Sequence, residues 1–316
     1  MRMEASTNID LSIVVSVFNE AEGLPSFWNE LKNEFSRMTQ SVEVIFVNDG
    51  STDRSAIELE TIQKEAISAQ VRIIEFSRNY GHEAAMIAGI DESVGNRVIC
   101  MDADLQHPPS VIGSLILEAD SGADIVLAER KSRADNGFLK NAMSGLFYGL
   151  INRLSSFKLT PNSTDFFLIS RPVAEVLKAH FRDRNRFIRG FIQSIGFTKA
   201  IVAFDAPARK HGSSSYSYSD LFELATTAIF SYSNKPLRIS ILISVMFILF
   251  TSILAVYSID QYVRGNTPPS GYTTIILFLS TSFAALFGVI AILSLYFEKA
   301  LEEQRGRPIY IVKKKN

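Results

Sequence analysis

The sequence has few of the residues that several common classes of protein require. Cys100 is the single cysteine among 316 residues, which excludes an internal disulfide and any cluster of cysteine ligands for a metal. The 32 lysine and arginine residues are balanced by 33 aspartate and glutamate residues, so no overall positive charge favours a nucleic-acid partner. Cys100 lies within an apolar run, where we expect a packed and unreactive thiol.

Signatures of the common nucleotide-binding loops are also missing. The first apolar run, 11–18, is followed by Asn19 and Glu20 and not by a Gly-x-Gly-x-x-Gly turn. A nicotinamide-dependent dehydrogenase is therefore disfavoured. No lysine-containing phosphate loop of the Walker type occurs either. Phosphate groups bound by this chain would therefore have to be held by a metal ion and by arginine side chains.

The chain does contain β-type apolar runs that alternate with segments of helical periodicity. Strands are expected at 11–18, 42–47, 71–76, 98–101, 124–128 and 164–170. This alternation predicts right-handed crossovers and an α/β domain with a mostly parallel sheet covered by helices on both faces. We expect the domain to occupy 1–217.

Polar residues follow these strands, and the carboxyl ends of parallel strands meet at one edge of a sheet. We therefore expect one crevice that is lined by a shared set of polar side chains. The set comprises Asn19, Glu20, Asp49, Arg78, Asp102, Asp104 and Arg130.

The stretch from Arg97 to Pro109 gives the most specific indication of a functional site. Asp102 and Asp104 are separated by one alanine directly after an apolar strand, and Gln106 adds a third side-chain oxygen. Oxygen ligands this close together suit a hard divalent cation such as Mg²⁺ or Mn²⁺, which in turn suits a diphosphate. A polar turn without a metal is the alternative. The strand before the acids and the proline residues after them favour the metal site.

Long apolar runs are confined to the C-terminal part of the chain. Segments 237–257 and 272–297 are long enough to cross a bilayer. Basic residues gather on their outer flanks, whereas the connecting loop 260–271 contains only Arg264, so the positive-inside rule places both ends in the cytoplasm. A helical hairpin buried in a soluble core is the alternative. The polar N-terminus lacks a secretory signal, which fits a cytoplasmic domain.

The segment before these spans, 218–232, has apolar residues at helical spacing between aromatic ends, as expected of a helix lying on a membrane surface. The expected organisation is a domain over 1–217, an interfacial helix over 218–234, a transmembrane hairpin over 235–298 and a basic tail over 299–316. We expect an integral membrane protein, with the bacterial inner or plasma membrane favoured and with the domain and both termini in the cytoplasm.

Seven segments in a fixed order resemble a known family. They read SIVVSVFNE, VIFVNDGSTDRS, SRNYGHEAAMIAGI, VICMDADLQHPP, STDFFLISR, RNRFIRG and ARKHGSSSY. The set resembles family 2 glycosyltransferases with the GT-A fold, of the polyprenyl-phosphate branch that includes the dolichol-phosphate mannose synthases. The resemblance covers most of the chain. It implies a GT-A (Rossmann-like) domain and inverting transfer of a sugar from a nucleotide donor to the phosphate of a membrane lipid.

The resemblance also implies roles for individual residues. Contacts to the nucleotide-sugar are implied for Asn19, Glu20, Asp49, Arg78 and Asp102, with Asp49 on the base. The metal and diphosphate site is implied for Asp102, Asp104 and Gln106, and the catalytic aspartate beside the acceptor is Asp165. Ligands for donor or acceptor phosphates are implied at Arg130, Arg133, Arg184 and Arg186.

Three positions depart from the family pattern. Ser16 stands where proline is frequent, Phe167 stands where arginine is common, and Ser215 replaces a common lysine. Because two cations near the phosphates are lost, other arginine residues have to compensate, and which ones do so is open at this stage.

The expected function is therefore membrane-bound transfer of a hexose, with a UDP-sugar such as UDP-glucose favoured, to undecaprenyl or dolichyl phosphate for glycan or cell-envelope modification. The expected partners are donor, lipid and membrane, with no nucleic acid, and a homo-oligomer is an open alternative. A processive polysaccharide synthase needs a Gln-x-x-Arg-Trp motif after its acidic motif, but the single tryptophan, Trp28, precedes it. A non-catalytic membrane scaffold or lipid-carrier partner with a degenerate transferase domain is the last alternative, disfavoured because the candidate acids are intact.

Overall fold

The computed structural model describes residues 9–67, 69–131, 163–182, 187–205, 207, 235–264 and 271–315. These residues fall into two compact units. The sheet unit contains the described residues up to 207 together with 307–315, and the helical unit contains 235–264 and 271–306. The last residues of the chain therefore belong to the same unit as the first.

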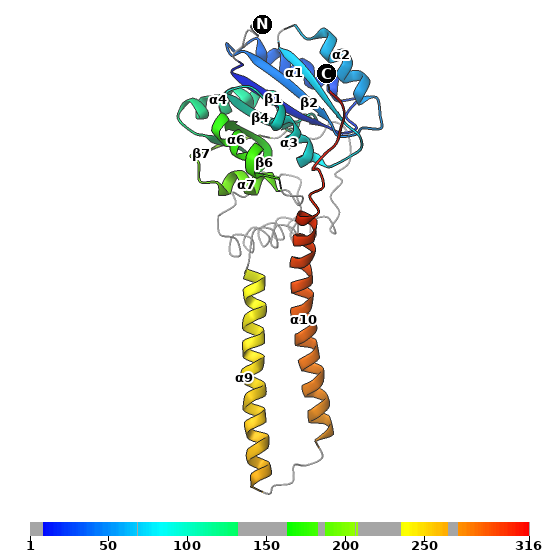
Figure 1. Ribbon diagram of the computed structural model, residues 1–316. Coiled ribbons are helices and arrows are strands. Elements are labelled where there is room, and N and C mark those ends of the chain that lie inside the picture. Colours follow the sequence, from blue (N-terminus) through cyan, green and yellow to red (C-terminus); the bar gives the residue numbers. More distant parts are fainter. Residues whose placement is uncertain are drawn as a thin grey trace, which may run out of the picture. The chain divides into compact units, whose positions relative to one another are not determined.

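The sheet unit is built on a single mixed sheet. Its strands are β1 (Leu11–Val17), β2 (Val42–Asn48), β3 (Gln70–Phe76), β4 (Arg97–Asp102), β5 (Ile125–Arg130), β6 (Ser163–Ser170), β7 (Lys199–Phe204) and β8 (Val312–Lys315). They lie in the order β7-β5-β6-β4-β1-β2-β3-β8 (Figure 1). Strands β1 to β4 form parallel pairs, as do β5 and β7, whereas β6 and β8 run antiparallel to their neighbours. The predicted mostly parallel α/β sheet is confirmed.

Helices cover both faces of this sheet. They are α1 (Leu24–Phe35), α2 (Ser55–Glu65), α3 (His82–Glu92), the short 3₁₀ helix η1 (Pro109–Val111), α4 (Ile112–Asp120), α6 (Arg171–His180) and α7 (Ile188–Ser194). Alternate residues of β1 point to opposite faces and join separate cores, one beneath α1 and α4 and the other beneath α3 and α6. All of β1 is buried, which explains why its residues are apolar apart from Ser12 and Ser16.

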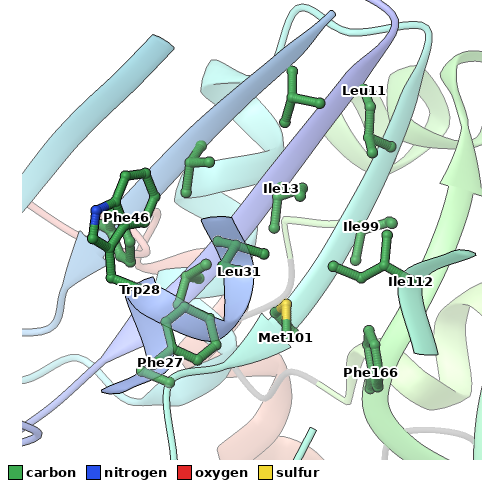
Figure 2. Packing of buried hydrophobic residues seen from close by; sticks show 14 of the residues in the cluster. Leu11, Ile13, Phe27, Trp28, Leu31, Phe46, Ile99, Met101, Ile112 and Phe166 are labelled. Atoms are coloured by element: carbon green, nitrogen blue, oxygen red, sulfur yellow. The ribbon is translucent and has the colours of Figure 1, made fainter. Parts of the chain in front are cut away.

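Close packing of side chains fixes the helices on the sheet. Figure 2 shows the core beneath α1 and α4, where Phe27 and Trp28 face the strands. The Trp28 and Phe46 rings meet edge to face with centroids 6.2 Å apart. On the other face, a Cβ added at Gly89 would lie 2.1 Å from Val14 Cγ1, so glycine lets α3 approach β1 closely. That approach places the first turn of α3 at the carboxyl end of β1.

The helical unit consists of α9 (Lys235–Val263) and α10 (Tyr272–Gln304). Their segments Ser240–Gln261 and Leu277–Glu298 have mean hydropathies of 2.4 and 2.1, and both are long and apolar enough to cross a membrane. Only 6% and 0% of the most apolar stretches are buried, whereas a hairpin in a soluble core requires extensive burial. The expected interfacial helix, 218–234, lies outside the described residues.

The end of the chain contains a strand that the sequence did not predict. The sequence predicts a basic tail from 299 onward, whereas α10 continues to Gln304 and the chain then returns to the sheet as β8. Strand β7 was not predicted either. Strand β8 pairs antiparallel with β3, with Ile74 opposite Lys315 and Phe76 opposite Val312. The tail is therefore the last strand of the sheet on the β3 side.

Candidate active site

The sheet register brings acidic residues from separate strands to one edge. Ser16 of β1 lies opposite Asp102 of β4, both at the carboxyl ends of their strands. Strand β6 is antiparallel to β4, with Cys100 opposite Phe167. Asp165, near the start of β6, therefore reaches the same edge as Asp102, although the two are far apart in the sequence.

Asp102 is surrounded by polar groups that favour its charged form. The Ser16 hydroxyl donates a hydrogen bond of 2.9 Å to Asp102 Oδ1, and the Asp102 backbone N–H donates to His107 Nδ1 at 3.1 Å. Burial acts to raise the pKa of Asp102, but nearby His82, His107 and Arg130 and the Ser16 hydrogen bond hold it below its ordinary value. Asp102 is therefore a carboxylate at neutral pH.

His82, the first residue of α3, lies between the two candidate acids. Its Nδ1 is 2.8 Å from Ser16 Oγ and 3.3 Å from Asp102 Oδ1, and its Nε2 is 3.7 Å from Asp165 Oδ2. Burial acts to lower the pKa of His82, but Asp102 and Asp165 raise it above its ordinary value overall. A protonated imidazole at this point reduces the repulsion between the two carboxylates.

Arg189 of α7 holds the other oxygen of Asp165. The Arg189 Nε is 2.9 Å from Asp165 Oδ1, and its Nη1 donates a hydrogen bond of 3.0 Å to the Ser163 carbonyl. The Asp165 side chain retains 18% exposure. Because Arg189 faces one oxygen and His82 the other, the carboxylate is fixed in orientation while part of it stays accessible.

The loop after β4 presents Asp104 and Gln106. The Gln106 backbone N–H donates a hydrogen bond of 3.0 Å to Asp104 Oδ1, and Leu105 between them has a φ of 61°. That left-handed conformation is uncommon for leucine and marks a tightly constrained turn. Arg130, at the end of β5, donates a hydrogen bond of 3.0 Å to Gln106 Oε1. The amide oxygen predicted as a metal ligand is thus directed at Arg130.

Asp49 connects the loops that follow β2 and β3. Its buried carboxylate accepts hydrogen bonds from the backbone N–H groups of Tyr80, at 2.6 Å, and Gly81, at 2.9 Å. Gly50 has a φ of 67°, and a Cβ there would lie 2.3 Å from the Arg78 carbonyl carbon. The two loops therefore pack with no room for a side chain, and Asp49 fixes the backbone at 80–81. A contact between Asp49 and a base stays a prediction.

The remaining predicted nucleotide contacts lie beside these loops. Asn19 has a φ of 55°, and its Oδ1 accepts a hydrogen bond of 2.9 Å from the Thr52 backbone N–H. Glu20 follows in the same turn. The Arg78 guanidinium is exposed and lies over the Tyr80 ring, 4.2 Å from its centroid. These residues share the carboxyl edge of β1, β2 and β3.

Glu83 is a half-buried acid that no sequence pattern pointed to. Burial, reinforced by Asp165, raises the pKa of Glu83 to about 8. The side chain also accepts a hydrogen bond from the Ile188 backbone at the start of α7. Glu83 is therefore mainly protonated at neutral pH and adds little negative charge next to Asp165.

Comparison with known proteins identifies the family. The model of "Glycosyl transferase family 2" matches residues 12–178. The chain belongs to this family. The bactoprenol glucosyl transferase of Shigella phage SfII is 37% identical over 96% of this chain and 97% of its own length. An uncharacterized glycosyltransferase of Synechocystis sp. is 34% identical over 96% of this chain and 95% of its own length.

Solved structures of low sequence identity are also similar. The crystal structure of glucosyl-3-phosphoglycerate synthase from Mycobacterium tuberculosis, which contains Mn²⁺, UDP and glucosyl-3-phosphoglycerate, is 16% identical with a TM-score of 0.46. The match covers 70% of this chain and 78% of that one. The family model confirms the resemblance inferred from the motifs at the level of the family, and the chain is a family 2 glycosyltransferase with a mostly parallel sheet domain.

The carboxylates of this glycosyltransferase suit a metal that arrives with its substrate. Among the described residues, no group of three or more His, Cys, Asp or Glu side chains could hold a metal ion. Asp102 and Asp104 supply hard oxygen ligands, and Mg²⁺ is often held by one or two carboxylates together with substrate phosphates and water. The two aspartates fit that arrangement. Gln106 would have to release Arg130 to join them.

Three of the predicted phosphate ligands, Arg133, Arg184 and Arg186, lie outside the described residues, as does Ser215. Three residues that the structure places at the site were not predicted as site residues, namely Ser16, His82 and Arg189. His82 could have been found, because it opens a helix directly after the predicted strand 71–76 and its glycine turn. The role of Arg189 depends on how α7 packs against β6, which no local pattern encodes.

Proposed function

We propose that this family 2 glycosyltransferase is a membrane-bound, inverting enzyme that transfers a hexose from a UDP-sugar, with UDP-glucose favoured, to a polyprenyl phosphate. The observation that carries the proposal is the pair of carboxylates, Asp102 and Asp165, held on either side of His82 at one edge of the sheet. The end-to-end similarity to a bactoprenol glucosyl transferase supports the lipid acceptor.

The chain's own residues account for the acceptor side of the reaction. An acceptor phosphate oxygen bonds to the anomeric carbon while the bond from that carbon to the diphosphate breaks, which inverts the configuration. A phosphate monoester has a second pKa of about 6 and is largely a dianion at neutral pH, so it needs little help from a general base. We assign Asp165 to orienting the acceptor or the sugar, with Arg189 and His82 fixing its two oxygens.

Asp102 and Asp104 are the residues assigned to a Mg²⁺ or Mn²⁺ ion. When bound, such an ion would neutralise the charge that develops on the departing diphosphate. Ser16 orients Asp102 Oδ1, and the Gln106 backbone N–H orients Asp104 Oδ1. Because these hydrogen bonds fix the orientation of both carboxylates, little rearrangement is needed when the donor binds.

Arginine residues are assigned to the phosphates of donor and acceptor. Arg130 lies at the end of β5 and donates a hydrogen bond to Gln106 in the loop after β4. Arg133, Arg184 and Arg186 are proposed to share with it the role of binding phosphates. Phe167 is fully buried in the core beneath α3 and α6, so it contributes nothing polar to the site. Arg189 brings a guanidinium to Asp165 from α7 instead, and we propose that it compensates for the arginine missing at 167.

Strand β8 supports the proposed topology. It pairs with β3 in the same sheet that contains β1 to β4, although α9 and α10 lie between them in the sequence. If each helix crosses the membrane once, the sheet unit and the C-terminus must be on the same side. The basic flanks of the hairpin make that side the cytoplasm, in the inner or plasma membrane of a bacterium.

A donor panel tests the proposed function. The purified full-length protein is placed in vesicles containing undecaprenyl phosphate and offered UDP-glucose, UDP-galactose, UDP-N-acetylglucosamine or GDP-mannose with Mg²⁺. Mass spectrometry of the extracted lipid should detect a hexosyl phosphate product with UDP-glucose. Absence of a glycolipid with every donor would overturn the proposal. A product from GDP-mannose alone would overturn the assignment of the nucleotide and sugar.

A further inference from the structure

The segment after α10 forms a strap along the outer side of β3, and we define the strap as residues 309–315. Strand β8 forms its second half, and the Ser77 backbone N–H donates a hydrogen bond of 3.0 Å to the Ile311 carbonyl just beyond the ladder. Ile309 and Tyr310 pack against the core beneath α3 and α6. The strap therefore contacts both β3 and the start of the loop that follows it.

The lysine residues of the strap form ion pairs that contribute little to its attachment. Lys313 lies 2.9 Å from Glu75, Lys314 lies 2.8 Å from Glu60, and Lys315 pairs with Glu92. All three lysine side chains are about half exposed or more, and solvent and salt screen exposed pairs of this kind, so they add little stability. The attachment must depend mainly on backbone pairing and on Tyr310.

Tyr310 is the anchor of the strap. Its ring stacks on Phe76 with centroids 5.0 Å apart and an angle of 12° between the ring planes. Its hydroxyl donates a hydrogen bond of 2.8 Å to Asp91 Oδ2, and Asp91 also accepts two hydrogen bonds of 2.8 Å from Arg182. Tyr310 is thus fixed at both ends, by an aromatic stack and by a charged acceptor.

Phe76 also contacts the loop that Asp49 holds. Phe76 is 1% exposed, and its ring meets Tyr80 edge to face with centroids 5.7 Å apart. Tyr80 and Gly81 donate their backbone N–H groups to the Asp49 carboxylate. A continuous series of contacts therefore runs from Tyr310 through Phe76 and Tyr80 to Asp49.

We propose that the strap positions the donor-binding loop 77–81, with Tyr310 acting through Phe76 and Tyr80 on the nucleotide site at Asp49. The proposal rests on the proposed function, in which Asp49 and Arg78 contact the nucleotide. It gives the C-terminus a role in donor binding that is separate from the membrane hairpin. Tyr310 is a positioning residue in this scheme, because it touches neither substrate nor reacting atoms.

Tyr310→Ala removes the stack and the Asp91 hydrogen bond, whereas Tyr310→Phe keeps the stack alone. Lys314→Ala is the matched control, since it removes an exposed ion pair from the same strap. Each variant is made in the full-length protein in detergent. UDP affinity with Mg²⁺ is measured by calorimetry, and backbone hydrogen exchange is measured at Tyr80 and Gly81 without ligand.

Tyr310→Ala is expected to weaken UDP binding by about tenfold and to speed exchange at Tyr80 and Gly81, while Tyr310→Phe and Lys314→Ala stay within about twofold of the wild type. The proposal would be overturned if Tyr310→Ala folds and has the UDP affinity of the wild type and its rate of hydrogen exchange at 80–81. The strap would then only stabilise the sheet. If Tyr310→Ala does not fold, Tyr310→Leu, which keeps apolar burial without a stack, is judged by the same two measurements. Wild-type protein that does not bind UDP would overturn the proposed function instead.

Discussion

The sheet unit and the helical unit are both rich in large apolar side chains, but they leave these side chains in opposite environments. Phe46 of β2 is 0% exposed in the core beneath α1, whereas Phe250 of α9 is 50% exposed. In the sheet unit, burial within the protein removes apolar surface from water. In the helical unit, no part of the described chain covers these side chains to that extent, and a lipid bilayer would do so. Among the described residues, the candidate acids Asp49, Asp102, Asp104 and Asp165 lie at one edge of the sheet unit.

The largest effect expected from a single substitution lies at that edge. Asp104→Ala should lower turnover by at least about 10³-fold, because one of the two carboxylates assigned to the metal is lost. Asp120→Ala, an exposed aspartate at the end of α4, is the control and should retain wild-type turnover. Initial rates of glycolipid formation at saturating donor provide the measurement. Near-normal turnover in Asp104→Ala would exclude this metal site.

The two units should respond differently to the loss of an aromatic ring. Phe46→Ala should reduce the free energy of unfolding of the sheet unit by about 3–5 kcal/mol, because a buried ring is replaced by a cavity. Phe250→Ala should leave that unfolding transition unchanged. Urea denaturation followed by Trp28 fluorescence reports on the sheet unit, since Trp28 packs against Phe46. Equal destabilisation by both variants would mean that the helical unit contributes to the core.

His82 should have a smaller but distinct effect on catalysis. His82→Ala removes the group between Asp102 and Asp165, and we expect turnover to fall about 10- to 100-fold through misorientation of Asp165. His180→Ala, on the exposed end of α6, serves as the control. Steady-state kinetics with varied donor and acceptor separate the effects. Unchanged kinetics in His82→Ala would contradict the assigned positioning role.

The last effect expected is a dependence of stability on pH. The pKa of Glu83 is raised from 4.5 to about 8 in the folded protein, so folding favours its protonated form. That contribution is fully present below pH 4.5 and is lost as the pH rises through about 8. Thermal unfolding at pH 6 to 9 should show a decline in Tm that is smaller in Glu83→Gln, which stays neutral, and the rest of the decline is expected from His82, whose pKa is also raised. The same decline in Glu83→Gln would assign it to other groups.

The sequence predicted those parts of the sheet that depend on local pattern. Strands β1 to β4 are apolar runs that end in polar residues, and this pattern is sufficient to place Asp102 and Asp49 at strand ends. Strand β7 was missed because its side chains are only partly buried and its pattern is weak. Strand β8 was missed because three of its four residues are lysines, which are poor strand formers without acidic partners on adjacent elements.

The site was predicted where chemistry follows directly from a motif, as in the pair of aspartates after β4. The place of His82 at the start of a helix could be predicted from the sequence, but the contacts of Ser16, His82 and Arg189 could not. Each depends on two elements that are remote in the chain but adjacent in the fold, such as β1 against α3 for Ser16 and His82. The local sequence pattern does not indicate which remote elements lie next to each other in the fold. The direction of Gln106 toward Arg130 is a further example.

We propose that the sheet unit binds the donor and that the helical unit holds the enzyme at the membrane, where the lipid acceptor lies. Replacing 235–306 with a flexible Gly-Ser linker tests it while keeping β8 and Tyr310, which truncation before α9 would remove. UDP affinity should stay within about threefold of the full chain, whereas transfer to undecaprenyl phosphate in vesicles should fall by about 100-fold or more because the enzyme no longer resides at the membrane. Transfer to a short, water-soluble polyprenyl phosphate should be largely retained. Loss of UDP binding, or undiminished transfer to the long-chain lipid, would contradict this division.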